Sequence, residues 1–151
     1  MFSDSVPRIF VVDDEPVVAS TIAAILQLHG YCANSFTSPL EALTAARSRA
    51  PDMLISDVAM PGVSGIDLAI QMRTQFPTCR ILLLSGHAAV LDLVEDAQFK
   101  ENRFAFLQKP IPPAQLVFEV GKIINGKVAI RTVLADWASG MARLPLDPQE
   151  T

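Results

Sequence analysis

In RIFVVDDEP, residues 8–16, a run of four β-prone apolar residues ends in three consecutive acids and a proline. Pro16 suits the first turn of a helix, where its missing N–H leaves no hydrogen bond unmade, and Gly30 suits the end of that helix. Between these two residues, apolar side chains recur at helical spacing. The stretch therefore predicts a buried strand, a short acidic turn and a helix over residues 16–29.

Beyond this stretch, short apolar runs continue to alternate with longer amphipathic ones as far as residue 125. The run at 31–36 is more polar, as an edge strand is, whereas the consecutive aliphatic residues within 80–84 are typical of a strand covered on both faces. Five strands alternating with five helices predict an α/β fold, with helices on both faces of a parallel sheet. The other strands are expected at 53–57 and 104–107, and the other helices at 38–49, 66–76, 88–98 and 113–125.

The helix at 38–49 has a recognisable beginning and an apolar side. Ser38 can cap its N-terminus, since a serine hydroxyl accepts a hydrogen bond from a free backbone N–H there. Leu40, Leu43 and Ala46 are expected to point inward, because their spacing is that of one helix face.

The composition is that of one globular domain. The chain has 151 residues, half of them apolar, and a formal net charge of −4. It has no basic run, so direct binding to nucleic acid is not expected. No stretch approaches the roughly 20 apolar residues of a membrane span and no signal peptide is visible, so we expect a cytoplasmic protein without a membrane partner. Cys32 and Cys79 lack metal-site spacing and are expected to be free thiols, buried or half-buried.

Polar residues stand where four of the five expected strands end. Asp13 and Asp14 follow the first strand, Asp57 the third, Ser85 the fourth and Lys109 the fifth. Each has an ordinary structural explanation when taken alone: acids favour a helix N-terminus, an aspartate often occupies a turn, and a loop lysine is usually solvated. Because ligands of such folds bind at the carboxyl ends of the strands, we nevertheless expect these side chains to meet at one edge of the sheet.

Together these residues predict a site of phosphoryl transfer. Clustered carboxylates repel one another unless a cation or a proton intervenes, and Mg2+ prefers carboxylate and phosphate oxygens. An aspartate can act as a nucleophile and form an acyl phosphate. The outer oxygens of the phosphoryl group then need positive or hydrogen-bonding partners, which Mg2+, Lys109 and the Ser85 hydroxyl or a backbone N–H would supply.

Four sequence blocks make the prediction more specific: VVDDEP at 11–16, DVAMPGVSG at 57–65, LLSG at 83–86 and LQKP at 107–110. In this order and at this spacing, over about residues 8–125, they resemble the receiver domains of bacterial two-component signalling, in particular the single-domain, chemotaxis-regulator type. The resemblance implies a flavodoxin-like, doubly wound (βα)5 fold with a five-stranded parallel sheet in the order 2-1-3-4-5. It also implies a switch rather than an enzyme with a separate substrate. A sensor histidine kinase or a phosphotransfer protein would phosphorylate it, and it would act on a downstream protein that the sequence does not identify.

The resemblance assigns the phosphoacceptor and the metal ligands. Asp57 matches the residue that takes the phosphoryl group. Asp57 and Asp14 match direct ligands of Mg2+, for which Mn2+ can substitute, and Asp13 matches a ligand that acts through water. The backbone carbonyl of Ala59 matches the remaining protein ligand.

The resemblance also assigns the residues that respond to the phosphate. Ser85 and Lys109 would contact the phosphoryl oxygens, and Phe106 matches the aromatic switch residue that turns inward when Ser85 moves toward the phosphate. Many relatives have a tyrosine at this position, whose hydroxyl makes a polar contact that phenylalanine cannot make. Exposing the side chain of Phe106 to solvent is therefore expected to cost more free energy than exposing a tyrosine. Ala59 and His87 flank the expected phosphate, which makes them candidates for setting the lifetime of the phosphorylated state.

An Mg2+-dependent phosphohydrolase with an aspartate nucleophile is the alternative that uses the same chemistry. The haloacid-dehalogenase type places a second aspartate two residues after its nucleophile, as general acid for the leaving group. Here Ala59 stands two residues after Asp57, and Glu15 stands two after Asp13. A nucleotide- or flavin-binding module would instead need a Gly-rich or Ser/Thr-rich phosphate loop where this chain has acids.

Residues 127–151 form an extension after the expected receiver domain of residues 1–126. Their apolar spacing predicts an amphipathic helix over about 127–143, followed by a disordered tail. The apolar stripe contains Trp137 and is expected to pack on the receiver domain, on a second subunit in a homodimer, or on an absent partner. The extension is too short for a DNA-binding output domain, and the sequence leaves open whether the chain stands alone or belongs to a longer protein.

Overall fold

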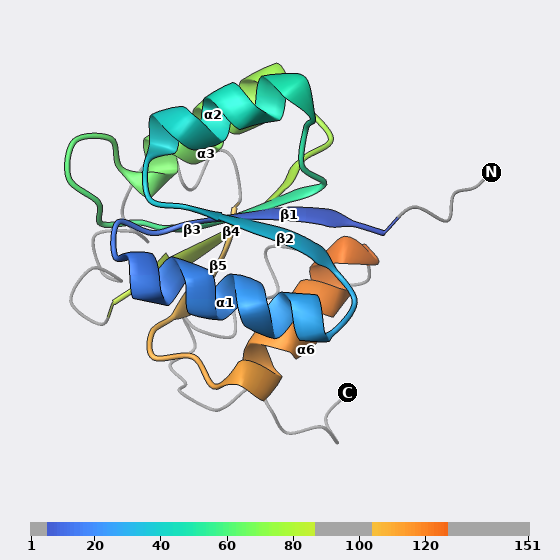
Figure 1. Cartoon of the computed structure of the whole chain (residues 1–151). Helices are drawn as coiled ribbons and strands as arrows, with labels where there is room; N and C mark the ends of the chain where they lie inside the picture. Colours follow the sequence, from blue (N-terminus) through green and yellow to red (C-terminus); the bar gives the residue numbers. More distant parts are fainter. Residues whose placement is uncertain (1–5, 87–103, 127–151) are drawn as a thin grey trace.

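The computed structural model describes residues 6–86 and 104–126. Within these ranges strands and helices alternate along the chain (Figure 1), and each element begins and ends within one residue of its predicted bounds. The helix expected at 88–98, the residue His87 and the extension lie outside the described residues. The elements are β1 (Arg8–Val12), α1 (Pro16–Leu28), β2 (Cys32–Phe36), α2 (Pro39–Ser48), β3 (Met53–Asp57), α3 (Gly65–Gln75), β4 (Arg80–Ser85), β5 (Ala105–Gln108) and α6 (Pro113–Ile124).

The five strands form one parallel sheet in the order β2-β1-β3-β4-β5. This is the flavodoxin-like order, in which the chain reverses its direction of winding between β1 and β3. β2 lies at an edge and exposes Asn34 and Ser35, which confirms that it is a polar edge strand. β4 lies inside the sheet and is buried from Ile81 to Ser85, as its aliphatic sequence predicts.

Each face of the sheet is covered by its own pair of described helices. Figure 1 shows α2 and α3 on one face and α1 and α6 on the other. Successive side chains of a strand point to opposite faces, so each strand contributes to both cores. In β3, Leu54 packs in the cluster that includes α2 and α3, whereas Met53 and Ile55 pack with α1 and α6. Packing on both faces therefore fixes the strands, and their carboxyl ends lie together at one edge of the sheet.

The start of α2 confirms one local prediction and corrects another. The Ser38 hydroxyl accepts a hydrogen bond from the backbone N–H of Glu41 at 3.3 Å, which makes Ser38 the N-cap. Leu43 and Ala46 are buried as predicted, but Leu40 is 68% exposed. The inward prediction for Leu40 is wrong because the buried face of α2 consists of Ala42, Leu43 and Ala46, and Leu40, in the first turn, lies outside this face.

Both cysteines are free thiols, as predicted. Cys32 is partly exposed and Cys79 is buried. Among the described residues, no helix is both long and apolar enough to cross a membrane.

Candidate functional site

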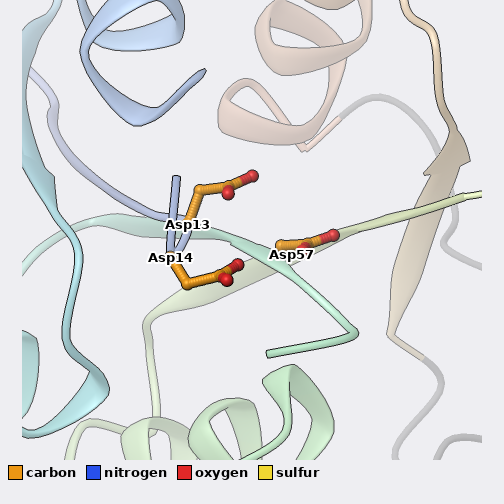
Figure 2. Close-up of side chains that lie close together, drawn as sticks. All are labelled: Asp13, Asp14 and Asp57. Carbon is orange, nitrogen blue, oxygen red and sulfur yellow. The ribbon is translucent and has the colours of Figure 1, made fainter. Parts of the chain in front are cut away.

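Three carboxylates meet at the carboxyl ends of the neighbouring strands β1 and β3. Asp13 and Asp14 follow β1 directly, and Asp57 is the last residue of β3. One oxygen from each carboxylate lies within 4.8 Å of the other two. Figure 2 shows the three side chains extending in the same direction from the two strand ends. The site thus lies where the winding of the sheet reverses, which is the usual place for a ligand in a doubly wound fold.

Two hydrogen bonds hold Asp13 in place. Its backbone N–H donates to the carbonyl of Phe36 at 3.1 Å, which ties the turn to β2. Its carboxylate accepts a hydrogen bond from the backbone N–H of Glu15 at 2.9 Å. Asp13 is buried, whereas Asp14 is exposed to solvent. The two adjacent acids therefore offer one fixed carboxylate and one that water can reach.

Lys109 brings a positive charge to the same edge from the end of β5. Its ammonium lies 3.1 Å from a carboxylate oxygen of Asp57 and 3.2 Å from one of Asp13. The backbone N–H of Lys109 donates to the carbonyl of Ser85 at 2.8 Å, so the end of β5 is fixed to the end of β4. One lysine thus links the ends of three strands through two ion pairs and a main-chain bond.

The charges at this edge do not balance. Burial is the largest effect on Asp57 and raises its pKa above 3.8; the charges of Asp13 and Asp14 add to this, although Lys109 opposes it. For Lys109, burial acts to lower the pKa, but the ion pairs with Asp57 and Asp13 outweigh burial and the pKa is raised. A single ion pair would move the two groups in opposite directions. Three carboxylates face one ammonium, so the edge carries excess negative charge, which adds to burial in raising the pKa of Asp57.

This donor set fits a small, hard divalent cation. All of the converging ligand atoms are carboxylate oxygens, which Mg2+ prefers over nitrogen or sulfur. Mg2+ usually keeps several waters, and the exposed position of Asp14 leaves solvent access for them. A divalent charge would also relieve the repulsion among the three carboxylates, which adds to the effect of burial on the pKa of Asp57.

The other residues singled out in the sequence lie near this edge in different environments. Ser85 is fully buried, and its hydroxyl donates to the carbonyl of Gly86 at 3.2 Å rather than to a carboxylate of the site. Phe106 lies in the core that includes α2 and α3, with 1% of its surface exposed, beside Leu83 of β4. Ala59 is exposed in the loop between β3 and α3.

Sequence reasoning missed the role of Gly65, the first residue of α3. Gly65 is buried against the end of β3, and its N–H donates to the carbonyl of Val58 at 2.9 Å. The block at 57–65 contains this glycine, but helix propensity alone makes a glycine at a helix start look unfavourable or neutral. Its purpose becomes visible only when the helix and the strand are seen in contact.

The family model of the response regulator receiver domain matches residues 9–121. The chain belongs to this family. The prediction of a receiver domain from the four sequence blocks is therefore confirmed, and the acidic edge lies in a receiver domain of two-component signalling.

Two relatives of this receiver domain are 35% identical to it. The phosphoglycerate transport system transcriptional regulatory protein PgtA of Salmonella typhimurium matches over 127 residues, and the transcriptional regulatory protein TcrX of Mycobacterium tuberculosis over 125. The matches cover 84% and 83% of this chain, but 29% and 52% of the relatives. The chain thus spans between about a third and a half of the length of these relatives.

Solved structures agree with the fold. A response regulator receiver domain protein from Clostridium thermocellum has a TM-score of 0.72 and 27% identity, covering 81% of this chain and 97% of its own. The receiver domain of NtrX from Brucella abortus has a TM-score of 0.70 and 25% identity, covering 78% and 98%. Each of these two solved receiver domains is thus matched over nearly its whole length by a part of this chain.

Proposed function

We propose that this receiver domain takes a phosphoryl group onto Asp57 in an Mg2+-dependent reaction and passes the signal to a protein partner. The observation that supports the proposal is the convergence of three carboxylates and one ammonium on a single strand edge. The donor would be the phosphohistidine of a sensor histidine kinase or of a phosphotransfer protein. This is the role of a switch, without a separate substrate to turn over.

In the proposed reaction, a carboxylate oxygen of Asp57 attacks phosphorus in line with the leaving group. A new P–O bond forms while the P–N bond of phosphohistidine breaks, and the electron pair of that bond leaves with the imidazole. Asp57 must be ionised to attack, and its ion pair with Lys109 favours this form. The side chains of Asp13, Asp14 and Asp57 and the carbonyl of Ala59 would hold Mg2+, which supplies positive charge next to the transferring phosphoryl oxygens.

Lys109 is proposed to contact one phosphoryl oxygen once Asp57 is modified, because its ammonium already lies 3.1 Å from that carboxylate. The Ser85 hydroxyl is proposed to leave the Gly86 carbonyl and donate to another oxygen. Ser85 and Lys109 are bonded through their main chains, so a movement of Ser85 reaches β5 and Phe106. Phe106 is the proposed switch residue, and Ala59 and His87 are proposed to influence the lifetime of the phosphate.

The proposal extends to the rest of the chain. Residues 1–126 form the receiver domain and residues 127–151 an extension that contributes to self-association. Both long relatives are transcriptional regulators by name. For this chain, with its net charge of −4, we propose output through a cytoplasmic protein target rather than direct contact with nucleic acid.

Labelling with acetyl phosphate tests the metal requirement. Intact-mass measurement should detect one added phosphoryl group in MgCl2 and none in excess EDTA, with MnCl2 restoring the label. Equal labelling with and without EDTA would contradict the proposed role of the metal. Steady hydrolysis of a phosphomonoester in MgCl2 would instead favour the phosphohydrolase alternative.

A further inference from the structure

Gly65 lies so close to the phosphoacceptor strand that no side chain fits there. A Cβ atom built on Gly65 would overlap the carbonyl oxygen of Asp57. It would also lie 2.9 Å from both the carbonyl carbon of Asp57 and the Cα of Val58, closer than the 3.0 Å below which real Cβ atoms essentially never approach a neighbour. All of these atoms are backbone, so none can swing aside as a flexible side chain would. A larger residue must push α3 away from β3 or displace the main chain of Asp57.

Space, and not backbone conformation, is the reason for this glycine. The glycines with positive φ among the described residues are Gly30, Gly62 and Gly126, and Gly65 is not one of them. An alanine at position 65 would even gain helix propensity. The cost of a side chain at position 65 therefore comes from the contact with Asp57 and Val58.

The same carbonyl of Asp57 is also held from within β3. The Ser56 hydroxyl, which is fully buried, donates to the Asp57 carbonyl oxygen at 2.9 Å. On the other side, the N–H of Gly65 donates to the carbonyl of Val58 at 2.9 Å and closes the loop over residues 58–64. The main chain at Asp57 and Val58 is thus fixed by Ser56 before it and by Gly65 after it, immediately before Ala59.

We propose that Gly65 is a positioning residue, whose missing side chain lets α3 seat against Asp57 and so sets the distance between the Asp57 carboxylate and the Ala59 carbonyl. This inference rests on the proposed function, in which both groups hold the same Mg2+. Mg2+ demands nearly ideal octahedral geometry, so it tolerates little displacement of a ligand. Residues that orient the ligands of a metal typically change its affinity by about 10–100-fold when they are replaced.

Gly65→Ala tests the proposal, and Gly121→Ala is the matched control. Gly121 lies in α6, where a Cβ would meet only the Tyr31 hydroxyl, at an ordinary 3.8 Å. Titration calorimetry with MgCl2 should show about 10–100-fold weaker binding for folded Gly65→Ala and wild-type binding for Gly121→Ala. Labelling by acetyl phosphate at saturating MgCl2 should be slower in Gly65→Ala alone. Circular dichroism and thermal melts identify the temperatures at which each variant is folded.

Ser56→Ala keeps the proposal testable if Gly65→Ala does not fold. It removes the hydrogen bond to the Asp57 carbonyl without adding an atom, so we expect it to weaken Mg2+ binding by a few-fold. A folded Gly65→Ala with wild-type Mg2+ affinity and labelling rate would overturn the proposal. So would an unfolded Gly65→Ala combined with a wild-type affinity of Ser56→Ala. A wild-type protein that binds no Mg2+ and takes no label would contradict the proposed function itself, and the inference with it.

Discussion

Burial raises the pKa of Asp57 above its ordinary value, and the charges of Asp13 and Asp14 add to this, although Lys109 opposes it. When folding raises the pKa of an acid, its protonated form favours the folded state. This contribution to stability is complete below the pKa in the unfolded chain and is lost as the pH rises through the pKa in the folded protein. At neutral pH without metal, the charge of Asp57 therefore lowers the free energy of unfolding.

We expect Asp57→Asn to melt a few degrees higher than the wild type at pH 7 in EDTA. The gain should shrink as the pH falls and should vanish below 3.8, the ordinary pKa of the carboxyl, where Asp57 becomes protonated in both states. Thermal melts across this pH range check the sign. A lower melting temperature for Asp57→Asn at pH 7 would mean that the ion pair with Lys109 outweighs burial and repulsion.

Lys109 contacts two of the three acids, so its removal tests both the chemistry and the switch. We expect Lys109→Ala to slow labelling by acetyl phosphate by about tenfold, which corresponds to about 1.4 kcal/mol of lost stabilisation of the developing negative charge. The change in amide exchange of β5 on phosphorylation should be largely lost. Lys122→Ala is the control, because Lys122 lies over the Phe118 ring on α6 and carries the same charge. An undiminished response of β5 in Lys109→Ala would show that another group couples the phosphate to that strand.

At the scale of the elements, local sequence signals explain where the helices and strands begin and end. Ser38 caps α2 through the N–H of Glu41, and Ser64 caps α3 through the N–H of Asp67 at 3.1 Å. We expect Ser38→Ala to lower the free energy of unfolding by about 1 kcal/mol, the usual contribution of an N-cap serine. Ser48→Ala, at the exposed last residue of the same helix, should be nearly neutral. Urea denaturation measures both, and equal effects of the two substitutions would argue against the cap.

The strand ends of the site were predictable from the sequence, because a parallel sheet brings its carboxyl ends to one edge whatever the details of packing. Contacts between distant segments were not. Lys109 was expected at the same edge as the acids, but the sequence does not show that its ammonium pairs with Asp13, 96 positions away, as well as with Asp57. The approach of Gly65 to Asp57 depends on how closely α3 lies against β3. The wrong prediction for Leu40 has the same origin. The apolar spacing shows that α2 is amphipathic, but not how far the contact with the sheet extends toward the start of the helix.

At the scale of the whole molecule, the order β2-β1-β3-β4-β5 sets the relation between the acids and the proposed switch residues. The acids lie on the two strands between which the winding reverses, whereas Ser85 and Lys109 end the two strands beyond β3. The phosphoryl group would be added at the centre of the sheet, and the proposed conformational response would take place nearer to β5, at its edge. Phe106 lies on β5, is buried in the core and pairs with Leu83 of β4. A movement of Phe106 on phosphorylation would therefore disturb the packing between β4 and β5.

The proposed function depends above all on phosphorylation of Asp57. The most direct test is peptide mapping by tandem mass spectrometry after labelling with acetyl phosphate in MgCl2, with borohydride reduction to mark the acyl phosphate before digestion. We expect the mark on Asp57 alone, and no mark in Asp57→Asn under the same conditions. A mark on Asp13 or Asp14 in the wild type, or stable labelling of Asp57→Asn at the wild-type level, would contradict the account.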